Sequence, residues 1–207
     1  KFSLYEDLNV IENIRFFARA IEQWGDKAFY GSARFLDKSV QTKSFTMRHP
    51  VGVSALIVPW NSPLMLATWK IGPCLACGNT CVVKPSPLAP LSILQLGKLA
   101  NEAGIPPGVL NIVNGGKNVG EALVWNRAVD RVSFTGSVAA GKNIQVANAG
   151  TRLAPISLEL GGKSPNIVFA DTDLNLTVKG VLRSIFRSQG QSCVAGSRLI
   201  LQDVIYS

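Results

Sequence analysis

Apolar residues along the first fifty positions predict one helix and one short strand. Over residues 8–24 they recur every three or four positions, which predicts an amphipathic helix that stops at Gly25. Residues 26–44 mix polar and apolar positions without a clear period, and we predict a loop there. Residues 44–48 alternate as a strand does, and the His49-Pro50 pair ends that strand.

From Val51 onward, short apolar runs alternate with longer helical segments. The predicted strands cover 51–58, 80–83, 109–113, 131–134, 166–169 and 198–201, and the predicted helices cover 64–76, 91–103, 119–126, 137–149 and 174–188. Strands separated by helices indicate parallel β-α-β units. The strands are continuous runs rich in valine and isoleucine, as expected when both faces of a sheet are covered. The predicted fold class is therefore α/β, with a doubly wound, mostly parallel, Rossmann-like sheet.

The alternation of predicted strands and helices changes after Gly150. Residues 156–160 lead into Gly161-Gly162 before the next strand begins. We therefore predict a domain boundary near Leu160, with one domain over residues 1–160 and the start of a second α/β domain over 161–207. The first domain includes helix and strand elements before residue 51.

Composition narrows the classes of partner. The chain has 207 residues, of which 47% are hydrophobic and 16% charged, as in a globular protein with a core. The net charge of +8 would suit nucleic acid, but the basic residues are scattered and form no arginine-rich run. No apolar run approaches the ~20 residues that cross a membrane, and the first residues lack the features of a signal peptide. We expect neither a nucleic-acid nor a membrane partner, and a cytoplasmic location.

Metal binding and serine hydrolysis are both disfavoured. Cys74, Cys77 and Cys81 are spaced like part of a metal cluster, but the chain has one histidine and no second cysteine pair. We interpret these cysteines as small apolar residues of a buried helix and strand, and predict no metal site. A Ser-His-Asp hydrolase would have to use His49, and no nucleophile elbow is present. Four cysteines at this density fit a reducing interior better than a disulfide scaffold.

A phosphate-binding loop is the strongest rival motif. Ligands of open α/β sheets bind at the carboxyl ends of strands, in the loops that precede helices. The run 136–142 has P-loop spacing between a strand and a helix, and the apolar run before Asp171 resembles a magnesium-holding strand. However, Asn143 stands where a serine or threonine should bind the metal. A milder interpretation is that Gly136 and Ser137 start a helix whose N-terminal amides face a pyrophosphate.

Two residues stand out as candidates for covalent chemistry. Cys193 closes the run F-R-S-Q-G-Q-S-C, and Glu159 opens E-L-G-G-K-S-P. A thiol can act as a nucleophile, and a carboxylate can take a proton from water or from the thiol. Either residue alone is explained equally well as ordinary structure. Together with Asn61, Lys84 and the helix start at 136–137, they favour a catalytic interpretation.

These motifs, in this order, resemble the aldehyde dehydrogenase superfamily from about Val51 to Leu201. The matching runs are P-W-N-S-P, G-N-T-C-V-V-K-P-S, G-I-P-P-G-V-L-N-I-V-N-G, F-T-G-S, L-E-L-G-G-K-S-P-N-I-V-F and G-Q-S-C. Two further runs, A-T-W-K-I-G-P-C-L-A-C-G-N-T and C-V-A-G-S-R, look like the hydroxymuconic semialdehyde dehydrogenase group.

Family chains are more than twice as long, so the resemblance implies a partial chain. Residues 1–160 would be the dinucleotide-binding domain and 161–207 the truncated start of the catalytic domain, and the complete enzyme would be a homo-oligomer, a dimer or a tetramer.

The resemblance implies NAD(P)-dependent oxidation of an aldehyde to a carboxylic acid. Cys193 would attack the aldehyde carbon and form a thiohemiacetal, while the amide of Asn61 and the backbone N–H of Cys193 form the oxyanion hole. Loss of hydride would give a thioester, and Glu159 would activate the water that releases the acid. The alternative is an inactive dinucleotide-binding or subunit-pairing fragment. Much of the substrate tunnel lies outside the sequence, so the aldehyde is not identified.

The resemblance also implies a cofactor site for NAD or NADP. Lys84 would contact the adenosine ribose, with Ser86 nearby. Pro87 stands where NAD-preferring members often carry a glutamate, and without that carboxylate a 2′-phosphate meets less repulsion. We therefore predict that NADP is used at least comparably with NAD. The other implied cofactor residues are Ile57, Val58, Pro59, Trp60, Gly120, Phe134, Thr135, Gly136, Ser137 and Leu160.

Overall fold

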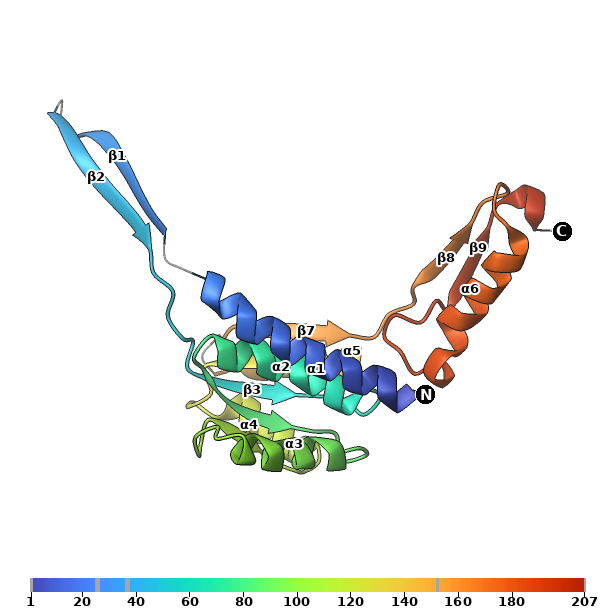
Figure 1. The fold of residues 1–207 in the computed structure, drawn as a ribbon, viewed down its shortest axis with the longest axis horizontal. Helices are drawn as coiled ribbons and strands as arrows, with labels where there is room; N and C mark the ends of the chain where they lie inside the picture. Colours follow the sequence, from blue (N-terminus) through green and yellow to red (C-terminus); the bar gives the residue numbers. More distant parts are fainter. Residues whose placement is uncertain (1, 25–26, 36–37, 152, 207) are drawn as a thin grey trace.

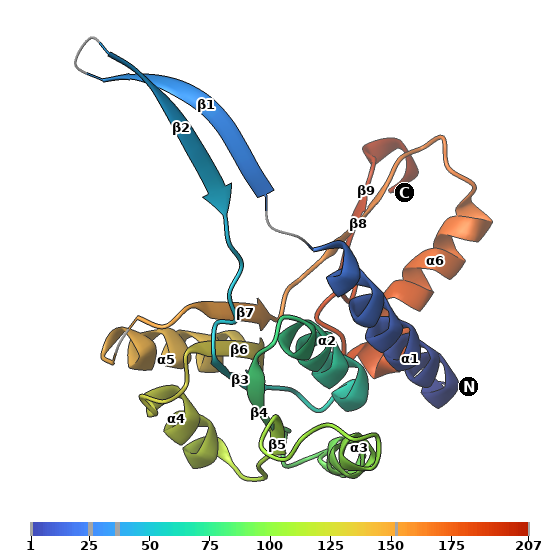
Figure 2. The ribbon, with the colours of Figure 1, turned by 60° about the vertical axis from the view of Figure 1, so that its left-hand side comes forward.

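A central α/β body with two projections makes up the computed structural model, which describes residues 2–24, 27–35, 38–151 and 153–206 (Figure 1). One projection is a β-hairpin and the other contains the last helix and strands of the chain. Helix α1 (Phe2–Ala20), followed by a 3-10 turn over Ile21–Gln23, lies alongside α2 (Pro63–Ala76) in both ribbon views (Figures 1 and 2). The backbone at Gly72 allows this approach, since a Cβ there would lie 2.7 Å from Cδ2 of Phe17.

Five parallel strands form the central sheet. Their order is β5-β4-β3-β6-β7, with bounds Leu110–Ile112, Thr80–Lys84, Val53–Ile57, Arg131–Gly136 and Ile156–Leu160. The chain moves outward from β3 through β4 to β5, then returns to the other side of β3 for β6 and β7. This order is that of a doubly wound α/β sheet and confirms the predicted fold class. The strand order reverses between β3 and β6, which is where such sheets bind ligands.

Helices cover both faces of this sheet, and consecutive residues of β3 belong to different cores. Leu56 packs with α2 and α3 (Leu91–Glu102), in the cluster that contains Ile71 and Ile93. Ile57 packs on the opposite face, with residues of α4 (Lys117–Trp125) and α5 (Val138–Ala149) nearby. Two covered faces require apolar residues at successive positions, which explains why the strands read as continuous apolar runs.

The predicted loop over residues 26–44 is wrong. Strands β1 (Lys27–Phe35) and β2 (Lys38–Thr46) pair in antiparallel register, and β2 includes part of the strand predicted over 44–48. Residues 26 and 36–37 lie outside the described part of the chain. Every described side chain of β2 from Thr42 to Thr46 is exposed, so neither face imposes the apolar alternation that marks a strand in sequence. The backbone ladder between the strands holds this hairpin together.

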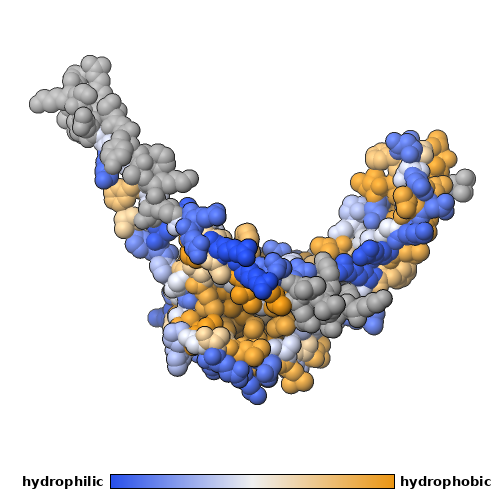
Figure 3. All heavy atoms as spheres, viewed as in Figure 1, coloured by the Kyte–Doolittle hydropathy of each residue, from blue (hydrophilic) through white to orange (hydrophobic). Residues whose placement is uncertain are grey.

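After residue 160 the chain builds a separate, smaller unit. Strands β8 (Pro165–Val168) and β9 (Arg198–Leu201) form a parallel pair joined through α6 (Leu174–Phe186). The chain ends with a 3-10 turn over Asp203–Ile205. Large apolar side chains remain exposed on this unit, as the space-filling view shows (Figure 3). The change of sheet falls at the predicted domain boundary, which remains a prediction.

Helix α6 is shorter than the predicted 174–188. It ends at Phe186 and passes into a 3-10 segment over Arg187–Gly190. Ser188 and Gln189 have φ values of +53° and +59°, in the left-handed region that non-glycine residues seldom adopt. No helix in the described part of the chain is long and apolar enough to cross a membrane.

Candidate functional site

The predicted site residues gather at one edge of the central sheet. Lys84 ends β4, Gly136 ends β6 and Leu160 ends β7, while Asn61 lies in the loop after β3. The carboxyl ends of parallel strands meet at the same edge, so four loops converge there. The chain also leaves this edge to enter the unit that carries Cys193 (Figure 1).

Asn61 joins the central sheet to the loop that carries the candidate nucleophile. Its Nδ2 donates a hydrogen bond to the carbonyl oxygen of Gln191 over 2.9 Å. This bond fixes which way the amide faces. The Nδ2 atom carries a second hydrogen. Asn61 Oδ1 is buried and accepts no hydrogen bond from any described residue.

The segment after Glu159 also reaches the loop over residues 191–197, which carries Cys193 and is called the nucleophile loop below. A Cβ added at Gly162 would lie 3.5 Å from the carbonyl oxygen of Cys193, so these backbones pass close to each other. Cys193 is exposed and its thiol is free, and Glu159 is exposed as well. The structure thus brings Asn61 and the segment that follows Glu159 to the same loop.

Polar contacts hold the nucleophile loop to its own unit. Asn166 Nδ2 lies 3.0 Å from both Ser184 Oγ and the carbonyl oxygen of Gly196, and so connects β8, α6 and the loop. The Gly196 N–H donates to the Ser184 carbonyl oxygen over 3.3 Å. A side chain at position 196 would collide with Asn166 and Ser184. This network offsets the cost, about 1–3 kcal/mol each, of the two left-handed residues that precede the loop.

Lys70 is a site residue that sequence reasoning missed. Its Nζ donates to Ser133 Oγ over 2.8 Å. The pKa of Lys70 is lowered to about 8, chiefly by burial; the Glu159 carboxylate raises it in part, and the Arg131 charge adds a smaller lowering. The ammonium group therefore lies within electrostatic reach of the candidate base. The signal in the sequence was a lone lysine within the otherwise apolar segment of α2.

Lys70 makes folding stability depend on pH in a defined direction. Its pKa is about 8 in the folded state against an ordinary 10.5, so between these values the unfolded chain binds more protons. Stability should therefore rise with pH across this window, by no more than about 3 kcal/mol. Urea unfolding below pH 8 and near pH 10.5 should show this rise for the wild type relative to Lys70→Met. Equal pH dependence in the two proteins would mean that Lys70 titrates normally.

A cavity of about 440 Å³ lies between α4 and α5, at the carboxyl ends of β3, β4 and β6. Four predicted cofactor residues line it: Ile57, Lys84, Gly120 and Phe134. A Cβ on Gly120 would sit 3.6 Å from Lys84 Cδ, in ordinary contact. Burial lowers the pKa of Lys84, whose Nζ donates to the Pro85 carbonyl oxygen over 2.9 Å. The lining is mostly apolar with a few polar residues, as in many small-molecule sites.

The remaining predicted cofactor residues lie around this cavity without lining it. Ser137 caps the N-terminus of α5, where its Oγ accepts from the Ala140 N–H over 3.2 Å. Leu160 packs against Gly141, where a Cβ would lie 2.7 Å from it. Gly136 is equally constrained, because a Cβ there would lie 2.5 Å from the Phe134 ring. The others occupy the ends of β3 and β6 or the loops that follow β3 and β4: Val58, Pro59, Trp60, Ser86, Pro87 and Thr135.

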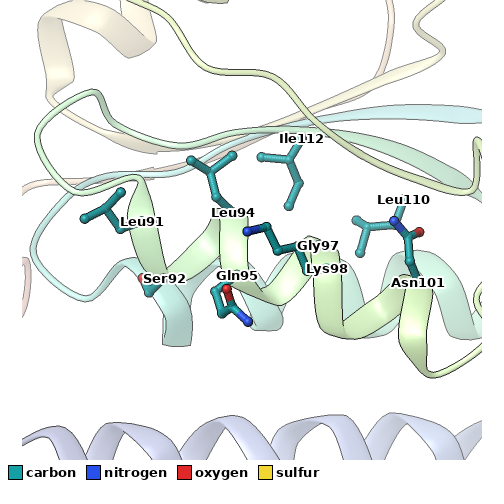
Figure 4. Close-up of a pocket in the computed structure, with 9 residues that line it drawn as sticks. All are labelled: Leu91, Ser92, Leu94, Gln95, Gly97, Lys98, Asn101, Leu110 and Ile112. Atoms are coloured by element: carbon teal, nitrogen blue, oxygen red, sulfur yellow. The ribbon is translucent and has the colours of Figure 1, made fainter.

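Another open groove runs along α3 and the edge strand β5. Figure 4 shows Leu94 of α3 facing Ile112 of β5 there. Lys98 is the one charged residue among its nine lining residues, and none of them was predicted as a site residue. Its lining shares no residue with the cavity between α4 and α5.

Two of the three cysteines outside the loop are buried, as predicted. Cys74 and Cys81 are buried in the core between α2 and β4, and Cys77 is half-buried. The described residues contain no group of three or more histidine, cysteine, aspartate or glutamate side chains placed to hold a metal ion. Asn143, at the metal position of the rival P-loop motif, lines the cavity between α4 and α5.

Known proteins resemble this chain over nearly its whole length. Retinal dehydrogenase 2 of Mus musculus is 46% identical over 206 residues, which are 99% of this chain and 38% of that protein. The crystal structure of PnpE from Pseudomonas sp. WBC-3 superimposes with a TM-score of 0.88 and 42% identity, over 97% of this chain and 40% of that one. The NAD+ complex of aldehyde dehydrogenase from Bacillus cereus gives 0.85 and 38%, over 95% of this chain and 39% of that one.

The chain therefore spans about two fifths of the length of these relatives. The family model described as the aldehyde dehydrogenase family matches residues 1–207. Since this match extends over all 207 residues, the chain belongs to the aldehyde dehydrogenase family.

Proposed function

We propose that the protein carrying this chain oxidises an aldehyde to a carboxylic acid with NAD or NADP. The observation that supports this most is the hydrogen bond from Asn61 Nδ2 to the carbonyl oxygen of Gln191, two residues before Cys193. It holds a side-chain amide against the loop that carries the only exposed thiol of the described chain. A nucleophile next to a fixed donor is the arrangement that acyl transfer needs.

The first step is attack by Cys193 Sγ on the aldehyde carbon. The carbonyl oxygen takes up the negative charge, and the second hydrogen of Asn61 Nδ2 and the backbone N–H of Cys193 stabilise it. One such preorganised donor contributes about 3 kcal/mol to the transition state. The loop network around Asn166 and Gly196 supports this role because it limits movement of the thiol.

The second step leaves a thioester on Cys193. The bound dinucleotide would supply the hydride acceptor. The cavity between α4 and α5 fits its adenosine end, with Lys84 at the ribose, and the N-terminus of α5 at Ser137 suits its pyrophosphate. Leu160, at the end of β7, would lie toward the nicotinamide.

The third step is hydrolysis, with Glu159 as the base. Its carboxylate takes a proton from water, the water oxygen attacks the thioester carbon, and the acid leaves as the C–S bond breaks. The nearby positive charge of Lys70 would stabilise the carboxylate between turnovers. An assay of NAD(P)H formation with simple aldehydes tests the whole proposal, and no aldehyde-dependent reduction by the full-length protein would refute it.

Pro87 should decide the choice between the two dinucleotides. The wild type is expected to use NADP at least comparably with NAD, because no carboxylate at position 87 repels a 2′-phosphate. In Pro87→Glu, kcat/KM for NADP should fall at least about tenfold while that for NAD is retained or rises. Pro87→Gln is the matched control, since it adds similar bulk without charge. A large preference of the wild type for NAD would contradict this prediction.

A cofactor-binding or subunit-pairing fragment without activity is the second candidate. The exposed apolar residues of the unit over 165–206 favour it, since that surface is unsuited to water. The active and the inactive candidate are separated by comparing the 207-residue chain alone with the full-length protein. The comparison covers intact mass, oligomeric state and turnover.

We further propose that the full-length protein is a cytoplasmic homo-oligomer related to the hydroxymuconic semialdehyde dehydrogenase group.

A further inference from the structure

Three consecutive residues just before the nucleophile loop have left-handed backbone conformations. The φ values of Ser188, Gln189 and Gly190 are +53°, +59° and +72°. Left-handed residues normally occur singly, because in each residue with a Cβ that atom crowds the following carbonyl oxygen. Of the three, only Gly190 escapes this crowding. The chain therefore reverses its handedness within a few residues of the right-handed helix α6, which ends at Phe186.

The side chain of Gln189 gives no reason for this conformation. It is exposed and makes no hydrogen bond to another described residue. Gly190, by contrast, is favoured by space as well as by its φ value, because a Cβ there would lie 3.4 Å from the carbonyl oxygen of Ile185. A backbone outlier without a local cause points to a role for the segment that it orients.

The left-handed turn determines where the carbonyl group of Gln191 lies. The turn is closed by the Gln191 N–H, which donates to the Ser188 carbonyl oxygen over 3.0 Å. The Gln191 carbonyl oxygen then accepts from Asn61 Nδ2 over 2.9 Å. A right-handed conformation over 188–190 would continue α6 and place residue 191 on the helix, so its carbonyl group would occupy a different position.

The turn that carries Cys193 has supports of its own. The Ala195 N–H donates to the Ser192 carbonyl oxygen over 3.2 Å and closes this turn around Cys193. The next residue, Gly196, donates its N–H to the Ser184 carbonyl oxygen in α6 over 3.3 Å. The left-handed turn therefore governs the carbonyl group that holds the side-chain amide more than it governs the position of the thiol.

We propose that Gln189 is a positioning residue for the oxyanion hole and acts through its left-handed backbone. Its conformation directs the Gln191 carbonyl group to Asn61, and that hydrogen bond orients the amide toward the oxygen that takes up charge. Such stabilisation depends on distance and orientation, so a displaced amide lowers the rate without weakening the binding of substrate. The inference rests on the proposed function, because it concerns the same reaction.

Substitutions at Gln189 in the full-length protein should follow backbone preference and not size or polarity. Glycine and asparagine adopt left-handed conformations readily, whereas a β-branched residue is an outlier there. Rapid mixing with saturating aldehyde measures the rate of the first turnover as NAD(P)H formation. Gln189→Gly and Gln189→Asn should keep this rate within about threefold of the wild type. Gln189→Val should lower it at least about tenfold, with dinucleotide affinity unchanged.

Gln95→Val is the matched control. Gln95 is exposed in the right-handed helix α3, so the same substitution changes size and polarity equally without opposing the backbone. Its first-turnover rate should stay within about twofold of the wild type. Equal losses in Gln189→Asn and Gln189→Val would assign the effect to the side chain and overturn the inference.

A double-mutant cycle with Asn61→Ala separates positioning from a general loss of structure. Asn61→Ala alone should lower the first-turnover rate about 10²- to 10³-fold. In that background Gln189→Val should cost no more than about a further twofold, because the amide that it misplaces is absent. The same tenfold loss in both backgrounds would mean that Gln189 is merely structural.

The parent variants show which idea fails. If Cys193→Ala and Asn61→Ala lose activity while Gln189→Val reacts as the wild type does, the inference is wrong and the proposed function stands. If neither Cys193→Ala nor Asn61→Ala changes aldehyde oxidation, both are overturned.

Discussion

Cys193→Ala should abolish aldehyde oxidation by the full-length protein, with a loss of at least about 10⁴-fold in kcat. Without the sulfur no thiohemiacetal forms, and Cys193 is the only exposed thiol in the described chain. Dinucleotide affinity should be unchanged, because the cavity between α4 and α5 lies on a different part of the sheet edge. Steady-state NAD(P)H formation and a fluorescence titration with NADPH measure the two quantities.

Cys77→Ala provides the comparison for this experiment. Cys77 is half-buried at the end of α2 and belongs to no proposed step. This variant should keep its activity within about threefold of the wild type. Substantial oxidation by Cys193→Ala would show that the nucleophile lies elsewhere and that the mechanism is wrong.

Glu159→Gln should separate the hydride step from hydrolysis. The amide cannot take a proton from water, so the thioester should accumulate after the first turnover. Removal of a general base costs roughly 10²- to 10⁴-fold. Rapid mixing should show a burst of NAD(P)H close to one per active site, followed by a steady state slowed by that factor.

The thioester itself is a second readout for Glu159→Gln. Rapid acid quench and mass spectrometry should find the acyl group on the peptide that contains Cys193. Glu102→Gln, at the exposed last residue of α3, should behave as the wild type does. A slow burst with no trapped thioester would assign Glu159 to an earlier step, for example deprotonation of the thiol.

The sequence predicted four of the five strands of the central sheet, because buried strands are marked by apolar runs, but residues 156–160, which form β7, were not predicted as a strand. Successive apolar residues such as Leu56 and Ile57 face different cores, so β3 reads as an unbroken apolar run. The hairpin β1–β2 has no such apolar run, because the described side chains of β2 are exposed on both faces. Its backbone hydrogen bonds have no sequence signature of their own.

Sequence motifs pointed to the residues proposed for catalysis. They did not point to residues whose role depends on contacts made only in the folded chain. Cys193, Glu159 and Asn61 stand in recognisable runs, although their roles remain predictions. The pKa of Lys70 is lowered by burial, which depends on the packing of α2 on the sheet, where Lys70 bonds Ser133 of β6.

The strand order of the central sheet has a consequence for folding. Val53 pairs with Thr80, a neighbour reached through one helix, whereas Ser54 pairs with Arg131, after two further helices and β5. Closing the longer loop costs more chain entropy, so β6 should join β3 after β3 and β4 have paired. The cavity between α4 and α5 needs walls from both halves. Dinucleotide binding during refolding would therefore report the late closure of the sheet, and a ligand present at that stage would stabilise the last contacts to form.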